Sequence, residues 1–160
     1  MMELHFKDFV LLNIYFPNGG SGEERLRYKL CFYDEFLKHI SGLVEQGKHV
    51  VFCGDVNTAH QAIDLARPKE NEKVSGFLPI ERSWMDQLVE AGFVDTFRSA
   101  EPETVKYSWW DMKTRARERN VGWRIDYFFV DQAFLPRVRE TEYLNDVPGS
   151  DHCPVLLKIG

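Results

Sequence analysis

The chain has 160 residues, a length typical of one domain, and a formal net charge of −5 at pH 7. Its 44% hydrophobic and 28% charged residues place it among soluble globular proteins, and the acidic excess argues against general affinity for polyanions. No apolar stretch approaches the roughly 20 residues that a membrane span needs. Because the N-terminus lacks a secretory pattern and the three cysteines lack metal-type spacing, we expect a reduced, cytoplasmic protein.

A strand, a helix and a strand are predicted in the first part of the chain. The nearly continuous apolar run at 9–16 predicts a buried strand that turn residues end. A long helix follows, from a cap at residue 21 or 22 to about residue 46, with one apolar face made of Leu26, Leu30, Tyr33, Leu37, Ile40 and Val44. The next buried strand, 49–53, ends just before Asp55 and Asn57. This order favours a layered α/β arrangement.

The second part of the chain alternates short elements with loops. Residues 58–78 are polar and irregular, and a helix begins at Pro79 and ends at Gly92. The remaining predicted elements are strands at 94–97, 107–110, 125–130, 142–144 and 155–159 and a helical turn at 134–137. No repeat, low-complexity segment or linker interrupts the chain, so we expect a single domain over residues 1–160.

Two acidic positions stand out against their apolar surroundings. Asp55 and Asn57 follow a buried strand, and strand-like alternation would point both side chains the same way; a turn held by Asx hydrogen bonds is the alternative. Asp126 lies inside an apolar strand, where a carboxylate is expensive unless it has a partner. A histidine from a neighbouring strand would be the natural partner, and His152 follows Asp151 at the start of the last strand, although that pair also suits a simple turn.

A locally basic segment offsets the acidic composition. Residues 113–119 contain Lys113, Arg115, Arg117 and Arg119, and Arg124 follows shortly after. Aromatic residues beside a basic strip are what a protein needs to hold an unstacked nucleotide, and Trp123 lies next to Arg124. A solvated charged loop and ordinary core packing of the tryptophans are the alternatives.

Four segments in a fixed order are more specific than any one of them. They read Asn-x-Tyr-x-Pro-Asn at 13–18, Gly-Asp-x-Asn-x-Ala-His at 54–60, Asn-Val-Gly-Trp-Arg-x-Asp-Tyr at 120–127 and Gly-Ser-Asp-His-Cys-Pro at 149–154. With them the chain resembles the exonuclease III family of abasic-site endonucleases, within the endonuclease/exonuclease/phosphatase superfamily. The resemblance covers residues 6 to 159.

The resemblance implies a fold, and it also implies that this chain corresponds to only part of that fold. Members are four-layered α/β sandwiches of the DNase I-like type, with mixed or antiparallel sheets face to face and helices outside. This chain matches only the carboxy-terminal part and lacks the segments that carry the Asn and Glu of the principal metal site. A truncated sandwich leaves the inner face of the sheet bare, so we expect a homodimer that covers it.

The resemblance also assigns roles. Asp55 matches the acid that prepares the attacking water, Asn57 the amide that holds phosphate and water, and His152, paired with Asp126, the histidine on the scissile phosphate. Asp151 matches an acid near the metal. The remaining matches contact substrate: Tyr15 and Asn18 a phosphate, Trp109, Trp123 and Ile125 the pocket for a flipped-out abasic sugar, and Arg115, Arg117, Arg119 and Arg124 the DNA.

The resulting hypothesis is a DNA phosphodiester hydrolase that depends on Mg²⁺ or Mn²⁺. It would act on double-stranded DNA, with or without abasic sites, as an exodeoxyribonuclease III-like 3′–5′ exonuclease or abasic-site endonuclease in DNA repair. A DNA-binding module without catalysis, a phosphatase acting on a small phosphoester, and a fragment that needs the missing half are the alternatives.

Overall fold

A five-stranded sheet lies at the centre of the computed structural model, which describes residues 1–160. Its strands follow the order β1-β2-β3-β7-β4. The parallel pair β2–β3 is the exception, since the other three pairs are antiparallel. The strand bounds are β1 Met2–His5, β2 Val10–Asn13, β3 Val50–Asp55, β4 Phe93–Asp95 and β7 Asp126–Asp131.

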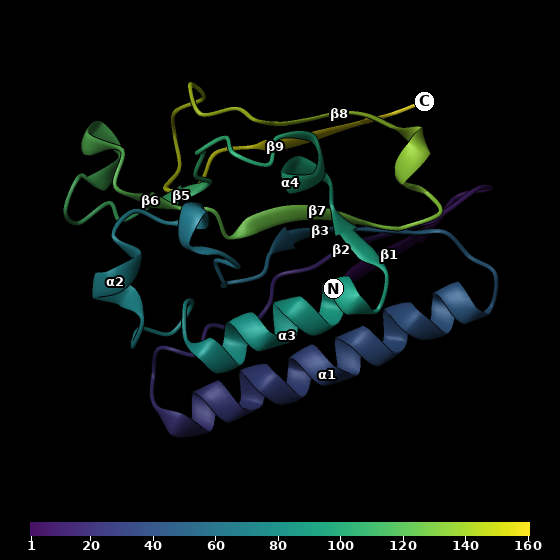
Figure 1. The fold of residues 1–160 in the computed structure, drawn as a ribbon, viewed down its shortest axis with the longest axis horizontal. Helices are drawn as coiled ribbons and strands as arrows, with labels where there is room; N and C mark the ends of the chain where they lie inside the picture. Colours follow the sequence, from purple (N-terminus) through teal and green to yellow (C-terminus); the bar gives the residue numbers. More distant parts are fainter.

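Two helices, α1 (Glu23–Glu45) and α3 (Pro79–Glu90), lie side by side on one face of this sheet and run in the same direction (Figure 1). Between them and the sheet lies the main core, a cluster of 17 buried residues. Phe52 of β3 is at its centre, stacked on Phe129 and in edge contact with Phe36 of α1. The apolar runs of the central strands are therefore buried against the helices, as the sequence predicted.

The buried face of α1 differs from the predicted one. The residues that are fully enclosed are Lys29, Tyr33, Phe36, Ile40 and Leu43. Leu30 and Leu37 pack only partly against the core, and Val44 is exposed. The buried face of α1 is thus rotated toward Lys29. A search for apolar residues passes over Lys29 because it is charged. It can be buried because its partner, Glu81, lies on α3.

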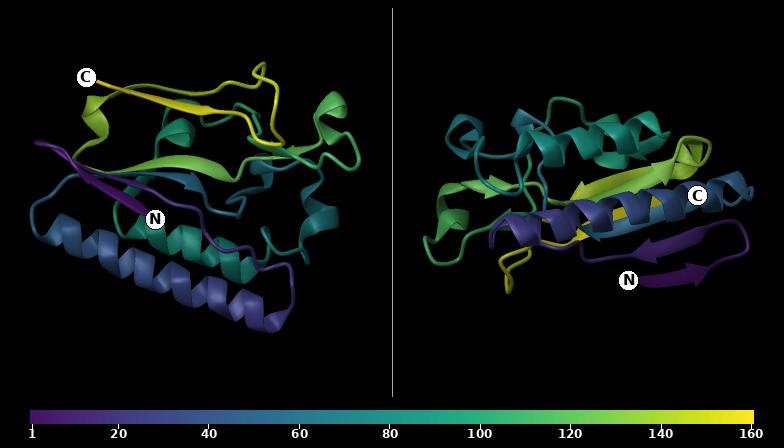
Figure 2. Two further views of the ribbon diagram at one scale, coloured as in Figure 1. Left: turned by 180° about the vertical axis from the view of Figure 1, so that it is seen from behind. Right: turned by 90° about the horizontal axis from the view of Figure 1, so that it is seen from below.

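On the opposite face of the sheet lies a two-stranded antiparallel ribbon, β8 (Val138–Tyr143) and β9 (Val155–Ile159) (Figure 2). A small cluster of Val51, Val130 and Phe134 is buried under it, with Leu157 and Ile159 packed alongside. Helices, central sheet and ribbon make a mixed α/β architecture of three layers, so the expected fold class is confirmed.

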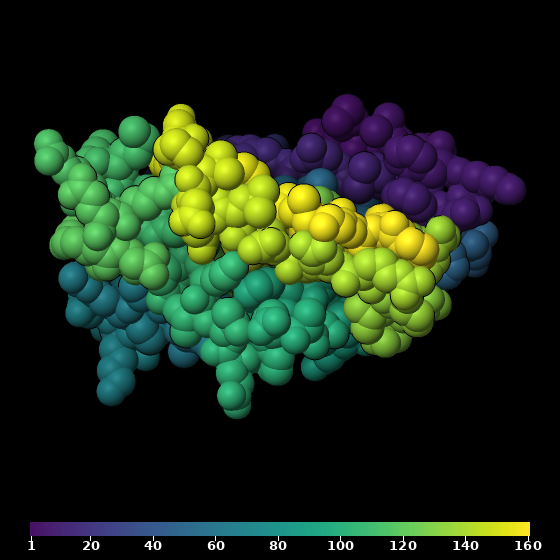
Figure 3. All heavy atoms as spheres, turned by 90° about the horizontal axis from the view of Figure 1, so that it is seen from above, coloured from purple at the N-terminus to yellow at the C-terminus, as the bar shows by residue number.

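The ribbon leaves the N-terminal edge of this second face open (Figure 3). Across the sheet, Leu4 pairs with Leu11, Leu11 with Val51 and Val51 with Val130, which places these side chains in one row. Val51 and Val130 are fully buried, whereas Leu4 is 43% exposed. The expected bare face therefore exists, but only over β1 and β2.

Short elements around the sheet complete the fold. These are η1 (Ala62–Asp64), α2 (Pro68–Asn71), α4 (Thr96–Ala100), β5 (Trp109–Trp110), η2 (Ala116–Arg119), β6 (Gly122–Trp123) and η3 (Leu135–Arg137). The strands β5 and β6 form a two-stranded sheet of their own. None of the helices combines the length and the apolar character needed to cross a membrane.

Two local predictions were wrong. The strand expected at 94–97 ends at Asp95, whose side chain accepts hydrogen bonds from the backbone N–H groups of Phe97 and Arg98 and so begins helix α4. The strand β1 was not predicted, because its four residues alternate between apolar and polar and gain a partner only when β2 lies beside them.

Candidate active site

The turn that follows β3 brings Asp55 and Asn57 together. The Asp55 Oδ1 accepts from the Asn57 backbone N–H at 2.8 Å, and Oδ2 accepts from the Asn57 side-chain Nδ2 at 3.1 Å. Asn57 has a left-handed φ of 54°, so strand alternation is not what aligns the two side chains; the Asx-turn interpretation is correct. Gly54, at φ 136°, allows this turn, since a Cβ there would lie 1.9 Å from the Ile14 carbonyl oxygen.

The Asn57 amide is fully engaged within the protein. Besides Asp55, its Nδ2 donates to the carbonyl oxygen of Phe16 at 2.9 Å. Both amide hydrogens thus have protein partners, so Asn57 orients the Asp55 carboxylate and does not present a free N–H donor to the pocket. The phosphate-holding role expected for Asn57 has no support in this geometry.

Beside this turn, Asp126 and His152 form the pair that the sequence predicted. Asp126 is the register partner of Asp55 across β3 and β7. Its Oδ2 lies 2.8 Å from the Nδ1 of His152, in the segment before β9. When Nδ1–H donates to Asp126, the free ring nitrogen is Nε2. The costly carboxylate inside an apolar strand therefore has its partner.

The position of Asp126 depends on a serine that the sequence did not single out. Ser108 is fully buried, and its Oγ accepts from the backbone N–H groups of Ile125 and Asp126, each at 3.0 Å. The Tyr143 hydroxyl donates to the Asp126 carbonyl oxygen at 2.6 Å. Ser108 lies in a predicted strand, and only the tertiary packing reveals that its hydroxyl fixes the start of β7.

The pKa values of Asp55 and His152 are both raised above the ordinary values of these side chains. Burial, and then the neighbouring charge of Asp126, raises the pKa of Asp55 to about 7. The hydrogen bond with Asp126 raises the pKa of His152. A carboxylate that exchanges its proton near neutrality, next to an imidazole, suits general acid–base chemistry.

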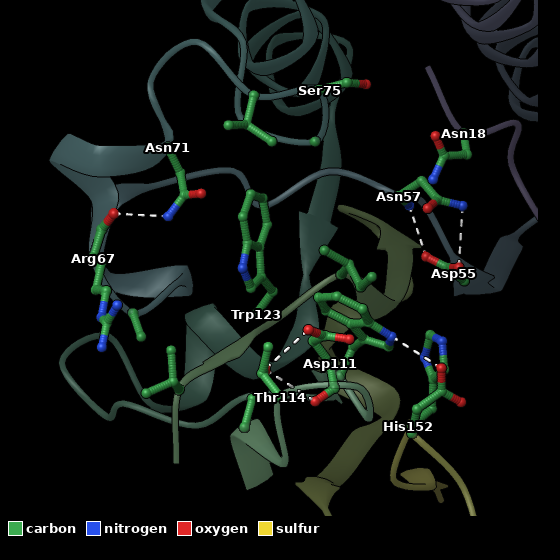
Figure 4. A pocket seen from close by; sticks show the side chains of 18 of the residues that line it. Asn18, Asp55, Asn57, Arg67, Asn71, Ser75, Asp111, Thr114, Trp123 and His152 are labelled. Carbon is green, nitrogen blue, oxygen red and sulfur yellow. Dashed lines mark hydrogen bonds between the residues drawn. The ribbon is translucent and has the colours of Figure 1, made fainter. Parts of the chain in front are cut away.

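Asp55, Asn57 and His152 line one end of an open pocket of about 590 Å³ (Figure 4). Arg67 and Asn71 lie at the opposite end, and Trp123 stands between the two ends. The pocket brings together most of the predicted site residues: Tyr15, Asn18, Asp55, Asn57, Trp109, Trp123, Ile125, Asp151 and His152. It also contains residues that the sequence analysis did not select: Arg67, Glu70, Asn71, Ser75, Asp111 and Thr114.

Aromatic side chains form the apolar wall of this pocket. Trp109 and Trp123 are register partners in the small sheet β5–β6, and Ile125 packs with them in one cluster. The Trp109 indole Nε1 donates to the Asp151 carboxylate at 3.2 Å. Although burial acts in the opposite direction, that hydrogen bond lowers the pKa of Asp151, so this carboxylate is ionised at neutral pH.

At the rim of the catalytic end lie Tyr15 and Asn18. Tyr15 is 66% exposed, and its hydroxyl has no protein partner. Asn18 is exposed, and its Oδ1 accepts from the Gly20 backbone N–H at 2.6 Å, an Asx-type hydrogen bond within a turn. Its amide nitrogen remains available to a ligand.

The four predicted DNA-binding arginines differ in exposure and in their partners, and Arg124 is the buried one. Arg115 and Arg119 are exposed on the loop beside the pocket. Arg117 instead donates to the carbonyl oxygens of Asn145, Val147 and Ser150 and stacks over Trp110, so it braces the loop that leads to Asp151.

Arg124 requires a correction. We expected it to bind substrate, but it is 0% exposed and lies 2.8 Å from Asp64 and 2.7 Å from Asp95. Its guanidinium also covers the ring of Tyr127. A side chain enclosed in this way cannot reach DNA. Adjacency to Trp123 in the sequence misled the prediction, because successive residues of an extended segment point to opposite sides.

The donor set for a metal ion is sparse. No three His, Cys, Asp or Glu side chains come together in a way that would hold a cation by themselves. Asp151 supplies one ionised carboxylate at the edge of the pocket. That fits a Mg²⁺ ion bound through one or two carboxylates, several waters and a substrate phosphate, and it does not fit a closed protein cage.

Comparison with known proteins is consistent with this geometry. Residues 4–152 match the model of the Endonuclease/Exonuclease/phosphatase family. The chain is 42% identical over 160 residues to an exodeoxyribonuclease of Bacillus subtilis and 44% identical over 153 residues to the DNA repair nuclease APEX1 of Danio rerio. It covers 99% and 95% of its own length in these alignments, but only 63% and 49% of the relatives.

Solved structures show the same relation. An AP endonuclease from Archaeoglobus fulgidus superposes with a TM-score of 0.89 at 25% identity, over 98% of this chain and 63% of that one. The AP endonuclease LMAP from Leishmania major gives 0.87 at 30% identity, over 93% and 49%. The chain thus spans about half to two thirds of the proteins that it matches.

Proposed function

Because the chain belongs to the Endonuclease/Exonuclease/phosphatase family, we propose that it is a metal-assisted hydrolase of phosphodiester bonds in double-stranded DNA. The observation that carries the proposal is the arrangement of Asp55, Asp126 and His152 at one end of a pocket with an aromatic wall. Relatives named as exodeoxyribonuclease and AP endonuclease favour DNA over a small phosphoester.

In this mechanism Asp55 takes the proton of a water that attacks phosphorus in line with the leaving 3′ oxygen. Asn57 orients the Asp55 carboxylate through two hydrogen bonds. A third hydrogen bond, from the Asn57 side chain to the Phe16 carbonyl oxygen, fixes the Asn57 side chain in the position that this requires. His152 directs Nε2 to a non-bridging oxygen, with Asp126 holding the ring through Nδ1. Tyr15 and Asn18 add donors from the rim.

Asp151 would hold Mg²⁺ or Mn²⁺, which when bound would neutralise charge on the leaving oxygen. Since the protein supplies few ligands, the affinity for the cation should be low, and millimolar concentrations should be needed. The apolar wall of Trp109, Trp123 and Ile125 would receive an abasic sugar turned out of the duplex. Arg115 and Arg119 would face the phosphate backbone.

The test is incubation of the purified chain with intact and abasic duplex, in Mg²⁺, Mn²⁺ or EDTA. We expect cleavage in the presence of either cation and none in EDTA. The variants Asp55→Asn and His152→Ala should each lower the rate by about 10²–10⁴-fold. Unchanged cleavage in both variants would refute the mechanism.

A DNA-binding protein without catalysis is the second candidate, and the sparse donor set favours it. The pocket and the exposed arginines would then bind a duplex that is never cut. Duplex binding without turnover at millimolar concentrations of Mg²⁺ or Mn²⁺ would select this candidate. Restoration of cleavage by an added amino-terminal half of a relative would instead show that the chain is a fragment.

We also propose that residues 1–160 act as one domain and pair as a two-fold homodimer. Support comes from the open part of the second face, where Met2, Leu4 and Phe6 are 53%, 43% and 52% exposed. Met2 and Leu4 lie in β1, and Phe6 directly follows it; β1 is an edge strand whose outer backbone groups have no strand partner. The same edge in a second copy is a self-complementary surface.

Light scattering coupled to size exclusion tests the dimer. We expect twice the chain mass at micromolar concentration and a monomer for Leu4→Glu. Ile80→Glu, at an equally exposed apolar position on α3, is the matched control and should leave the mass unchanged. A monodisperse monomer of the unmodified chain would contradict the proposal.

A further inference from the structure

Behind the Asp55–Asn57 turn lies a pair of opposite charges that is sealed from water. Lys29 of α1 and Glu81 of α3 are both 0% exposed, and Lys29 Nζ lies 2.6 Å from Glu81 Oε1. An apolar pair of similar volume would often be as stable or more so, because both charges lose their hydration. The pair therefore calls for an explanation other than stability.

The Lys29 ammonium holds the backbone of the turn. Its three hydrogens reach Glu81, the Asn57 carbonyl oxygen at 2.7 Å and the Thr58 Oγ1 at 2.9 Å. Asn57 is in the left-handed region, which asparagine tolerates better than most residues other than glycine but which is less favourable than the right-handed region. Lys29 fixes the carbonyl on one side of this residue while the Asn57 side chain reaches Asp55 on the other.

Glu81 extends the same support to the pocket wall. Its Oε1 accepts from the Ser75 hydroxyl at 2.9 Å, and its Oε2 accepts from the Gly76 and Leu78 N–H groups at 2.6 and 3.1 Å. The Gly76 backbone lies against the Trp123 ring so closely that a Cβ would be 3.2 Å from it. The pair thus ties the catalytic turn to the aromatic wall.

The charges around Asp55 give Lys29 a second effect. Asp126 approaches from β7, His152 from the segment before β9, Lys29 from α1 and Glu81 from α3. Burial and then Asp126 raise the pKa of Asp55, whereas His152 and Lys29 act in the opposite direction. Removing Lys29 would leave His152 as the one nearby cation that favours the carboxylate.

We propose that Lys29, neutralised by Glu81, is a positioning residue of the active site, because it holds the backbone of Asn57, the residue that orients the Asp55 carboxylate. Its effect on catalysis rests on the proposed function, but its effect on the turn does not. Lys29 itself touches no substrate, since it is enclosed beneath the turn.

The experiment distinguishes a role of Lys29 in positioning Asp55 from a role in the stability of the fold alone. Lys29→Met leaves Glu81 buried without its cation and should unfold readily, so Lys29→Met/Glu81→Gln and Lys29→Gln are the informative variants. Lys38→Met, on the exposed side of α1, is the matched control. Carbon-detected NMR follows the titration of the Asp55 carboxylate in each protein, and thermal unfolding reports the stability.

In the two informative variants we expect the Asp55 midpoint to move to higher pH by about half a unit or more. Cleavage at pH 7 should fall at least about tenfold. Lys38→Met should change neither. A folded variant with the Asp55 midpoint of the unmodified chain would overturn the proposal. Should the unmodified chain cut no DNA, the NMR titration still decides the role of Lys29, and only the proposed function fails.

Discussion

The core beneath α1 and α3 and the surroundings of the pocket differ in the residue types that they bury. The core is a cluster of 17 buried residues, all of them hydrophobic, in which aromatic rings such as Phe36, Phe52 and Phe129 pack on one another. Around the pocket, the buried side chains include Lys29, Asp64, Glu81, Asp95 and Arg124. The apolar core stabilises the fold. Around the pocket, burial of polar groups lowers stability but fixes their positions. Substitutions in the two regions should therefore change the free energy of unfolding in different ways.

The largest effect should come from the apolar core. Phe52→Ala removes a ring that packs on Phe36 and Phe129 and leaves a cavity that the strands cannot close. We expect a loss of about 3–5 kcal/mol in the free energy of unfolding. Urea denaturation measures it, with the m-value as a check on two-state behaviour. A loss below about 1 kcal/mol would mean that this region is not the main support of the fold.

The next effect tests the corrected role of Arg124. Arg124→Met leaves Asp64 and Asp95 buried without their shared cation. We expect a loss of about 3 kcal/mol at pH 7. The exposed Arg115→Met is the control and should stay within about 0.5 kcal/mol. If the two variants were equally stable in urea, the buried ion cluster would contribute nothing to the fold.

Substitution at the catalytic carboxylate should act in the other direction. Folded Asp55 keeps its proton up to about pH 7, whereas the unfolded chain loses it near 3.8. The folded state therefore binds more protons between these values, and stability falls as the pH rises through that window. Asp55→Asn removes this penalty, about 4 kcal/mol for a shift of about three pKa units, and should raise Tm by roughly 8–16 °C at pH 8 and by nothing below about pH 4.

Scanning calorimetry at both pH values checks this prediction. Asp86→Asn, at an exposed carboxylate that pairs with His60, is the matched control and should show no such gain at pH 8. A Tm for Asp55→Asn that is lower than that of the unmodified chain at pH 8 would mean that the ionised carboxylate stabilises the fold.

The smallest effect on stability is expected at the exposed rim. Arg119 donates only to the Thr114 carbonyl oxygen, so Arg119→Ala should change the free energy of unfolding by less than about 0.5 kcal/mol. Duplex binding should weaken, and the slope of log affinity against log salt should fall by about 0.9 if one phosphate contact is lost. An unchanged slope, measured by fluorescence anisotropy, would exclude Arg119 from the DNA interface.

Some features of the site followed from local chemistry and others did not. An acid inside the apolar strand at 125–130 demanded a partner, and the structure supplies His152. Arg124 looked like a DNA contact because its neighbours are basic or aromatic, but two acids far along the chain enclose it. The sequence analysis did not select Lys29, because Glu81, the acid that allows its burial, lies 52 positions away. Long-range ion pairs leave no periodic signal.

The sequence by itself determined the long elements and the order of the four polar segments, because these depend on apolar periodicity and turn chemistry within a few residues. Only the tertiary structure decided which charges are buried, which face of α1 meets the core and how much of the second sheet face stays open. Those outcomes depend on which distant side chains share one small volume, where a charge costs little if it is paired and much if it is alone.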